Sequence, residues 1–497
     1  MKPFLLKIII VAMVFLLCHK LEAQSKKVFD IVLMGGRVID PETKLDAIRN
    51  IGISKGLIAS ISTNALLGKE VIDVKGLVVA PGFIDMHVHG RTNQEQEFQL
   101  HDGLTTTLEL EWGVENIEQW YDSRKSKALI NFGASVCWPF ERFKAMEKYK
   151  EANKLIMENT IKGNSSLQNL FNTIGPSYKD KLSKEESSIM LININKSLAE
   201  GGIGIGIPIG YLPKTNPEEL YEIYKLAGEK QAMLFSHVRE PNMLSVQEAI
   251  ANASATGAPI HLVHINSMAL GHIQMALEII EAAKKRGVNI STEMYPYTAA
   301  STLLQSAIFN EGWQEKLEMS YNDLQWVLTG ERLTKESFDN YRQKGGGGVI
   351  MHMMQPEWLK LGMENPAVMI ASDGMPYSAL AHPRTAGTFS RVLGKYVRED
   401  KVIDLNTAIA KMTLLPANRL ESIAPSMLQK GRIQVGADAD ITIFNADKIM
   451  DKASFEKGLA FSEGVEFVIV NGALILKNGK TVVGVFPGKG VVGKFKK

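Results

Sequence analysis

The stretch GFIDMHVH, at residues 82–89, decides the fold of this chain. Its apolar residues predict a β-strand, and His87 and His89 end that strand. Because alternate residues of a strand face the same side, both imidazoles can point to one place. The stretch therefore predicts a strand that carries two metal-ligand side chains at its carboxyl end.

Seven further segments of this kind follow, separated by amphipathic stretches such as EELYEIYKLAGEK (218–230) and MALEIIEAAKKRG (275–287). This alternation is typical of βαβ units and a parallel sheet. Eight such strands favour a closed (β/α)8 TIM-like barrel over an open sheet. The seven segments are LTTTLELE (104–111), ALINFGASV (128–136), IGIGIPIG (203–210), AMLFSHV (232–238), PIHLVHI (259–265), VNISTEMYP (288–296) and AVMIASD (367–373).

The two ends of the chain differ from this middle part. With 497 residues the chain exceeds the ~250 at which single cores stop growing, so more than one domain is expected. Residues 28–79 predict short strands, and similar segments return in ADITIF (439–444) and VEFVIVNGALILKNGK (465–480). We expect a small β-sandwich domain from residues 24–81 and 425–497, flanking a barrel over 82–424.

A long stretch, residues 303–348, separates the seventh and eighth expected strands. It contains Trp313 and Trp326 and ends in four consecutive glycines. We interpret it as an insertion, which is either a mobile cover over the site or a solvated surface excursion.

Residues 1–23 have the pattern of a signal peptide. Lys2 and Lys7 precede an apolar run at residues 8–17, and the small residue Ala23 marks the expected cleavage position. This run is too short to span a bilayer. We therefore expect a secreted, periplasmic protein without stable membrane insertion after cleavage. A lipid-modified Cys18 is the alternative, although Leu17 stands where a small residue is needed.

Composition limits the partners. Fifty-six Lys and Arg stand against 54 Asp and Glu, a formal net charge of +2. That balance argues against a nucleic-acid partner, which usually needs a basic face. Only Cys137 would remain after cleavage, so a disulfide framework is excluded. A small-molecule substrate is expected, and the oligomeric state stays open.

Candidate metal ligands fall at the carboxyl ends of the expected strands. His87 and His89 end the first, His237 the fifth and Asp373 the eighth, and His264 lies near the end of the sixth. Barrel enzymes place their catalytic residues at this face, and imidazole with carboxylate suits zinc. Each residue alone is more simply explained by hydrogen-bonded packing, but together the five predict a metal site.

The segment VAPGFIDMHVHG (79–90) resembles the first-strand motif of the amidohydrolase superfamily. The remainder resembles its D-aminoacylase branch, the N-acyl-D-amino-acid deacylases, over nearly all of the chain and in the same order. The matching segments are SHVRE (236–240), TEMYPYTAAST (292–302), IASDG (370–374), HPRTAGTFSRVLGKYVRE (382–399), KMTLLPANRL (411–420), KGRIQVGADADITIF (430–444) and PGKGVVG (487–493).

The resemblance implies a barrel with a flanking β-sandwich, one or two zinc ions, and hydrolysis of an N-acyl-D-amino acid. Zinc would lower the pKa of a bound water and polarise the scissile carbonyl. Asp373 would take the proton of that water and pass it to the leaving amine. His237, His264 and a carboxylate would hold the tighter ion, and His87 and His89 a second one.

The chain departs from the branch at the second strand. The branch has a motif like GNCG there, whose Cys ligates the metal, whereas TTTLELEWG (105–113) places Trp112 at that position. Glu109 and Glu111 face one side of the strand, and Glu111 is nearer the rim. The expected fourth strand (203–210) contains no lysine that could be carboxylated and bridge two metal ions. We expect Glu111 to replace the thiolate, with Glu109 as runner-up; either could instead fill a polar barrel layer, and Cys137 is a weaker candidate.

A second departure concerns substrate binding. The branch has a motif like SHHK in the sixth strand, whose Lys helps to hold the substrate carboxylate, and Asn266 stands at that position. Tyr295 and Ser301 match the other carboxylate contacts of the branch. Arg239 and Arg384 are candidates for the missing cation, because guanidinium binds carboxylate in a bidentate fork. Either could instead form a structural salt bridge.

Two other functions stay open. One is a different amidohydrolase, such as an isoaspartyl dipeptidase or a cyclic-amide hydrolase. The stretch HPRTAGTFSRVL (382–393) favours the D-aminoacylase branch over it. The other is a non-catalytic periplasmic binding protein on the same barrel, which the retained histidines and Asp373 argue against.

Overall fold

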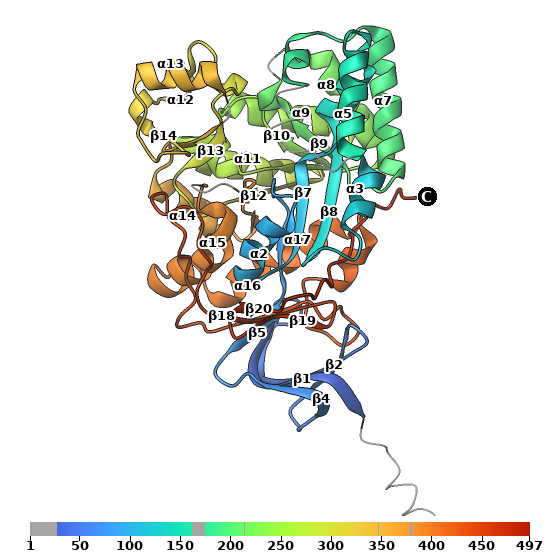
Figure 1. Ribbon diagram of the computed structural model, residues 1–497, viewed down its shortest axis with the longest axis vertical. Coiled ribbons are helices and arrows are strands. Elements are labelled where there is room, and N and C mark those ends of the chain that lie inside the picture. Colours follow the sequence, from blue (N-terminus) through green and yellow to red (C-terminus); the bar gives the residue numbers. More distant parts are fainter. Residues whose placement is uncertain (1–26, 162–173, 213, 346, 378–380) are drawn as a thin grey trace, which may run out of the picture.

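The computed structural model describes residues 27–161, 174–212, 214–345, 347–377 and 381–497. The expected signal peptide and Cys18 lie outside these residues. Two sheets dominate the architecture: a parallel sheet in the middle of the chain and a mainly antiparallel sheet at one end of the molecule (Figure 1). Within the described part of the chain, no helix combines the length and the apolar character needed to cross a membrane.

All eight expected barrel strands are present in one parallel sheet, in the order β16-β12-β11-β10-β9-β8-β7-β6. The two ends of this path meet, because Val88 and Gly374 form a parallel bridge and the His89 amide donates to the Gly374 carbonyl over 2.6 Å. The (β/α)8 fold class is thereby confirmed. The strands are β6 (Phe83–Asp85), β7 (Leu104–Val114), β8 (Asn131–Cys137), β9 (Ile205–Pro208), β10 (Leu234–His237), β11 (Ile260–Leu262), β12 (Ile290–Met294) and β16 (Val368–Ile370).

Helices surround the barrel, and the longer ones bury an apolar face against it. α8 (Pro217–Lys230) and α11 (Ile273–Lys285) coincide with the two amphipathic stretches named above. Ile223 and Ile280 lie on their buried faces. The remaining helices of this layer are α2 (Asn93–His101), α3 (Ile117–Arg124), α4 (Trp138–Ala145), α5 (Lys150–Ile161), α7 (Lys184–Ala199), α9 (Met243–Thr256), α10 (Ile265–Ala269), α14 (Pro356–Glu364), α15 (Arg384–Arg391), α16 (Leu405–Met412) and α17 (Leu414–Leu420).

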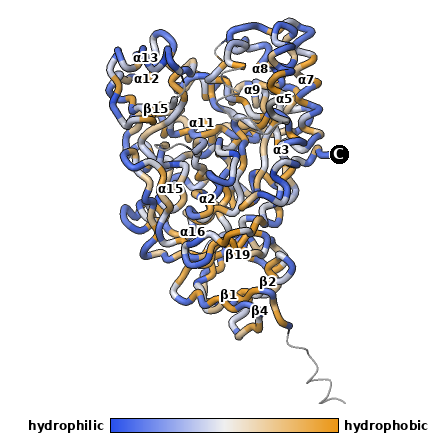
Figure 2. Tube along the Cα trace, viewed as in Figure 1, coloured by the Kyte–Doolittle hydropathy of each residue, from blue (hydrophilic) through white to orange (hydrophobic). Residues whose placement is uncertain are grey.

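Strands from both ends of the chain share the second sheet, in the order β20-β19-β18-β17-β5-β1-β2-β3, with β4 paired to β1. The two ends join where Val79 of β5 pairs with Ile443 of β17. The strands are β1 (Val28–Asp40), β2 (Leu45–Ser54), β3 (Leu57–Ser62), β4 (Leu67–Asp73), β5 (Val78–Pro81), β17 (Ile441–Phe444), β18 (Val465–Val470), β19 (Ala473–Lys477) and β20 (Lys480–Thr481). In Figure 2 this sheet is mainly apolar around β1 and β19.

The last residues of the chain lie against the barrel. The exact limits of the two domains remain a prediction. The Val491 amide donates to the Phe132 carbonyl of β8 over 2.7 Å, and the Gly493 amide to the Gly201 carbonyl over 2.8 Å. The segment assigned to the β domain from the sequence therefore also closes over the barrel wall.

The stretch between β12 and β16 forms a small subdomain at the expected place. Its strands β13 (Ala300–Leu303), β15 (Gly348–Met351) and β14 (Leu324–Trp326) lie side by side in that order, with α12 (Trp313–Leu317) and α13 (Lys335–Lys344) packed on them. Phe309, Trp313 and Phe338 belong to its own apolar core. It lies at the end of the barrel opposite the β domain (Figure 1), where the strands point their carboxyl ends.

Candidate metal centre

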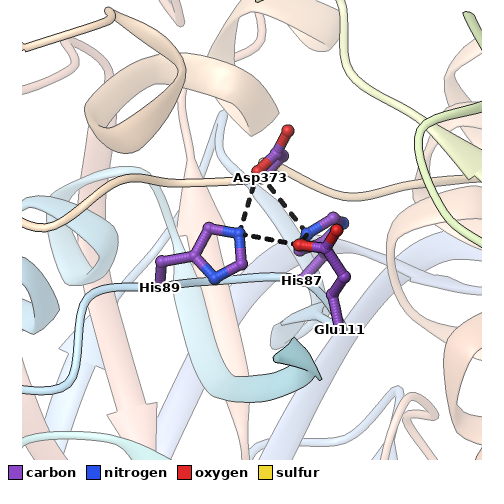
Figure 3. A group of neighbouring side chains, drawn as sticks. All are labelled: His87, His89, Glu111 and Asp373. Atoms are coloured by element: carbon purple, nitrogen blue, oxygen red, sulfur yellow. Dashed lines mark hydrogen bonds and ion pairs between the residues drawn. The ribbon is translucent and has the colours of Figure 1, made fainter. Parts of the chain in front are cut away.

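Four side chains from three places in the barrel wall meet at its carboxyl end (Figure 3). His87 and His89 follow β6, Glu111 lies on β7 and Asp373 follows β16. Glu111 Oε2 lies 3.1 Å from Nε2 of both histidines. Asp373 Oδ1 lies 3.2 Å from His89 Nε2 and 3.5 Å from His87 Nε2. Two ligands of one tetrahedral zinc ion lie about 3.4 Å apart, so these spacings fit a shared ion.

A second group lies beside the first. His237 ends β10, His264 follows β11, and their ring centroids are 4.8 Å apart. Glu111 belongs to this group as well, with Oε1 lying 3.8 Å from His264 Nε2. A carboxylate with one oxygen toward each group is suited to bridging two metal ions. The structure thus brings together all five metal ligands expected from the sequence, and Asp373 with them.

Each of the four histidines is held through its Nδ1 atom, which leaves Nε2 directed at the site. A partner on the far ring nitrogen is what fixes the tautomer and orientation of metal-binding histidines. The contacts are His87 with Glu293 Oε1 at 2.6 Å, His89 with Glu109 Oε1 at 3.2 Å, His237 with the Val238 carbonyl at 2.7 Å, and His264 with Ser267 Oγ at 3.1 Å.

The electrostatics of the first group favour a cation. Burial alone would lower the pKa of His87, but Asp373 and Glu293 outweigh burial and raise this pKa to about 10. Burial likewise opposes ionisation of Glu111, yet His264 and His87 hold its pKa well below the usual range. Buried carboxylates therefore attract positive charge to this place, and a metal ion would displace the imidazole protons.

The pKa of His237 is shifted in the opposite direction from that of His87. Burial, reinforced by His264, lowers the pKa of His237 to about 4, so its ring is neutral at neutral pH. Its Nδ1–H donates to the Val238 carbonyl. The Nε2 lone pair is consequently available to a metal without loss of a proton.

Two residues of the centre have a strained backbone. His264 has φ 32° and Asp373 has φ 51°, in the left-handed region that non-glycine residues rarely adopt. Such a conformation costs about 1–3 kcal/mol and persists where the surroundings enforce it, often at functional sites. Both residues stand where a strand ends, so the turn directs each side chain into the barrel mouth.

A cavity opens beside the two groups. His237, His264 and Asp373 line one side, and Tyr295 and Ser301 line another. Apolar side chains complete the wall, several of them from the inserted subdomain: Met268, Ile308, Leu317, Met351 and Met353. This mixture of polar and apolar lining suits a small molecule of mixed polarity.

Arg384 lies with the expected substrate contacts. Its Nη1 is 2.9 Å from Asp373 Oδ2, and its Nη2 donates to the Ser301 carbonyl over 3.3 Å. The guanidinium carbon lies 4.8 Å from the centre of the Tyr295 ring. Asn266 Nδ2 donates to the Tyr295 carbonyl over 3.2 Å. The structure thus places Arg384 and Asn266 in contact with the cavity-lining residues Tyr295 and Ser301.

Arg239 also borders the cavity, but its donors are engaged elsewhere. Nε and Nη2 donate to Glu248 over 3.0 and 2.8 Å, and Nη1 donates to the Thr215 carbonyl over 3.0 Å. These contacts favour the structural salt bridge over the substrate-binding role.

The other candidates from the second and third strands lie outside both ligand groups. Glu109 contacts His89 from behind and lies 3.5 Å from Arg91 Nε. Cys137 is buried, and burial raises the pKa of its thiol, which opposes the thiolate that a metal needs. Trp112 packs with its ring centroid 5.2 Å from that of Tyr211.

Sequence reasoning did not single out Glu293 and His261. Glu293 contacts His87 Nδ1, and His261 Nε2 contacts Glu293 Oε2 at 3.1 Å. A signal was present: polar residues Ser291 and Glu293 alternate along the seventh expected strand, so both point to one face. Whether that face of the strand points into the barrel is decided only when the barrel closes.

A barrel whose carboxyl end carries four histidines, a shared glutamate and an aspartate defines a metal-dependent hydrolase of the amidohydrolase type. Residues 214–476, more than half of the chain, match the Amidohydrolase family. The chain belongs to this family.

Several similar proteins align with this chain over most of both lengths. A D-aminoacylase of Alcaligenes xylosoxydans xylosoxydans is 29% identical over 468 residues, 90% of this chain and 94% of the relative. An N-acyl-D-glutamate deacylase of the same organism is 28% identical and covers 90% and 93%. A solved N-acyl-D-glutamate deacylase of Bordetella bronchiseptica, complexed with zinc and a phosphonate inhibitor, shares the fold with a TM-score of 0.79, 24% identity, and coverage of 94% and 100%. The resemblance to the D-aminoacylase branch is confirmed.

Proposed function

We propose that this amidohydrolase uses zinc to hydrolyse the amide bond of N-acyl-D-amino acids, releasing a carboxylic acid and a free D-amino acid. One observation carries the proposal: His237, His264 and Asp373 of the two ligand groups line the same cavity as Tyr295 and Ser301, and Arg384 contacts both of these last two residues. With zinc bound, the ligand groups can activate a water molecule and the substrate carbonyl. Arg384, Tyr295 and Ser301 can hold the substrate carboxylate. The substrates in the names of the D-aminoacylase and the N-acyl-D-glutamate deacylase support the same class.

The residues present fit zinc, because imidazole nitrogen and carboxylate oxygen are its common protein ligands. His237, His264 and Glu111 would hold one ion, and His87, His89 and the same Glu111 a second. Bound zinc supplies polarisation of the scissile carbonyl and activation of water at neutral pH.

Asp373 is arranged to move the proton. Its Oδ2 is fixed by Arg384, while Oδ1 faces the two histidines after β6. Burial alone would raise the pKa of this carboxyl, but Arg384 and His87 hold the pKa below its usual range, so Asp373 is ionised. It can accept the proton of the attacking water and return it to the nitrogen of the leaving amine.

The wall formed by Arg384 would hold the substrate carboxylate. Asn266, which stands where the branch has Lys, supplies no charge, and Arg384, which contacts Tyr295 and Ser301, is the cation that we assign to this role. Ser301 and Tyr295 border the cavity beside it. This arrangement would fix the amide carbonyl near the ligand groups and keep the substrate side chain among the apolar residues of the insertion.

A release assay tests the proposal. Zinc-loaded protein is given N-acetyl-D-leucine, N-acetyl-L-leucine and dihydroorotate, and free amine or ring opening is measured. We expect hydrolysis of the D substrate alone, and its loss in Asp373→Asn. Ring opening of dihydroorotate without hydrolysis of either acetylated amino acid would favour the cyclic-amide alternative.

We further propose that residues 1–23 direct export and that the enzyme acts in the periplasm. The lysines followed by a short apolar run and Ala23 support this. Cell fractionation with amino-terminal sequencing of the mature protein tests it, and a mature chain that still begins at Met1 in the cytoplasm would contradict it.

A further inference from the structure

A chain of buried hydrogen bonds lies behind His87, on the side away from the cavity. Glu293 Oε1 is 2.6 Å from His87 Nδ1, and Glu293 Oε2 is 3.1 Å from His261 Nε2. His261 Nδ1 is in turn 2.7 Å from Ser291 Oγ. His87, His261 and Glu293 are each at most 1% exposed, so water does not compete for these contacts.

The strand register places these residues. Ser291 and Glu293 alternate along β12 and therefore point to the same face. His261 lies directly opposite Ser291 in the parallel pair of β11 and β12. Packing of neighbouring strands thus fixes Glu293 from two sides before any ligand is bound.

One proton arrangement satisfies every member of the chain. Ionised Glu293 accepts from His87 Nδ1–H through one oxygen and from His261 Nε2–H through the other. His261 Nδ1 then accepts from the Ser291 hydroxyl. With its proton on Nδ1, neutral His87 has its lone pair on Nε2, which is the atom 3.1 Å from Glu111. The opposite neutral tautomer would leave Glu293 without its donor from His87 and would direct an N–H, which cannot ligate a metal, toward the ligand group.

We propose that Glu293 is a positioning residue for metal binding, which sets the tautomer and orientation of His87, and that His261 with Ser291 holds Glu293 in place. This inference rests on the proposed zinc-dependent function and adds residues that touch neither the substrate nor the metal. Such outer partners of a ligating histidine typically change metal affinity 10- to 100-fold, so about that loss is expected on removal.

The test is a double-mutant cycle on zinc affinity. The dissociation constant of each zinc is measured by chelator competition for wild type, Glu293→Gln, His87→Ala and the double variant. We expect Glu293→Gln to weaken one zinc about 10- to 100-fold. In the His87→Ala background, where His89, Glu111 and Asp373 remain in the same group, it should weaken that same zinc no further. Such non-additivity is what coupling through His87 requires.

A second pair of variants tests the other end of the chain. His261→Gln keeps a side-chain N–H that can donate to Glu293, whereas His261→Leu removes it. We expect His261→Leu to weaken the same zinc and His261→Gln to retain most of the affinity. This pair decides the question even where Glu293→Gln fails to fold.

Glu141 offers a matched control. It is a buried carboxylate on α4 that accepts from Ser197 Oγ over 2.8 Å and contacts no histidine in the described structure. Glu141→Gln should alter the melting temperature without altering zinc affinity.

Three outcomes separate the hypotheses. Wild-type zinc affinity in folded Glu293→Gln, or an equal loss in the His87→Ala background, would overturn the positioning role. Equal zinc affinities in His261→Leu and His261→Gln would overturn the part assigned to His261. A wild-type protein that binds no zinc would overturn the proposed function itself.

Discussion

Glu111 faces His264 from the opposite side of the barrel mouth, with Oε1 lying 3.8 Å from His264 Nε2. Its other oxygen lies 3.1 Å from His87 Nε2, so a single carboxylate is shared by both ligand groups. The D-aminoacylase branch that the chain resembles has a cysteine motif in this strand. In this chain a carboxylate lies within reach of both groups, on the strand where the branch has its cysteine.

Glu111→Ala should lower zinc content and turnover together, because both groups lose a shared ligand. Cys137→Ala should keep full zinc, since this buried thiol lies in neither group. Zinc per chain, measured beside the melting temperature, checks both. Full zinc in Glu111→Ala would move the bridging role to another residue, with Glu109 and then Cys137 the next to test.

The carboxylate bridge should also broaden metal selectivity. A hard oxygen ligand in place of a soft sulfur suits manganese and cobalt better than a thiolate does. We expect metal-free protein to regain activity with either ion, as well as with zinc. Glu111→Cys is the matched comparison and should shift the preference toward zinc. Identical selectivity in the two proteins would contradict the prediction.

His237→Ala should lose most of the bound zinc, because its group offers few protein ligands and cannot spare one. Metal analysis after gentle purification measures this. Wild-type protein without zinc or another transition metal would contradict the metal centre as a whole.

Asp373→Asn should reduce turnover roughly 10²- to 10⁴-fold, the range for a general acid–base group. Metal content should remain near that of wild type, because His87, His89 and Glu111 still surround that position. Steady-state kinetics on the zinc-loaded variant gives the answer. Near-normal turnover would assign proton transfer to a different residue.

The two arginines should behave differently. Arg384→Lys keeps the charge but loses the forked geometry, so KM for the N-acyl-D-amino acid should rise about tenfold. Arg239→Gln breaks a partly exposed pair with Glu248 and should cost at most about 1 kcal/mol of stability with KM unchanged. A raised KM in Arg239→Gln alone would reverse the assignment.

Stability should fall in acid partly through His101, which lies on α2 at the junction with the β domain. Its ring stacks on Phe461, with centroids 3.8 Å apart, and burial lowers its pKa to about 4. Between pH 4 and the ordinary pKa of about 6.5 the unfolded chain binds a proton that the folded chain excludes, so stability rises with pH across this window and is lost as pH falls.

The comparison of wild type with His101→Gln isolates this proton. One proton contributes at most about 1.4 kcal/mol per pH unit. Denaturant unfolding at pH 7 and pH 5 should show a smaller loss of stability in the variant. Equal losses in the two proteins would show that His101 does not carry the effect.

The sequence by itself determined the barrel and the kinds of side chain at its rim. Eight apolar segments separated by amphipathic stretches leave few other solutions, because each strand must be buried on both faces. His87, His89, His237, His264 and Asp373 stand at or near strand ends, and parallel strands bring such ends to one edge. The sequence favours Glu111 over Glu109 as the metal ligand because Glu111 lies two residues nearer the carboxyl end of the strand.

Only the tertiary structure decided what these side chains contact. Arg239 and Arg384 are equivalent candidates in the sequence, yet one is engaged by Glu248 and the other lies against Asp373. Glu293 is one acidic residue among many until β12 packs beside β11 and closes toward His87. Contacts across the barrel depend on register and closure, because residues more than two hundred positions apart meet there through packing, which no local pattern encodes.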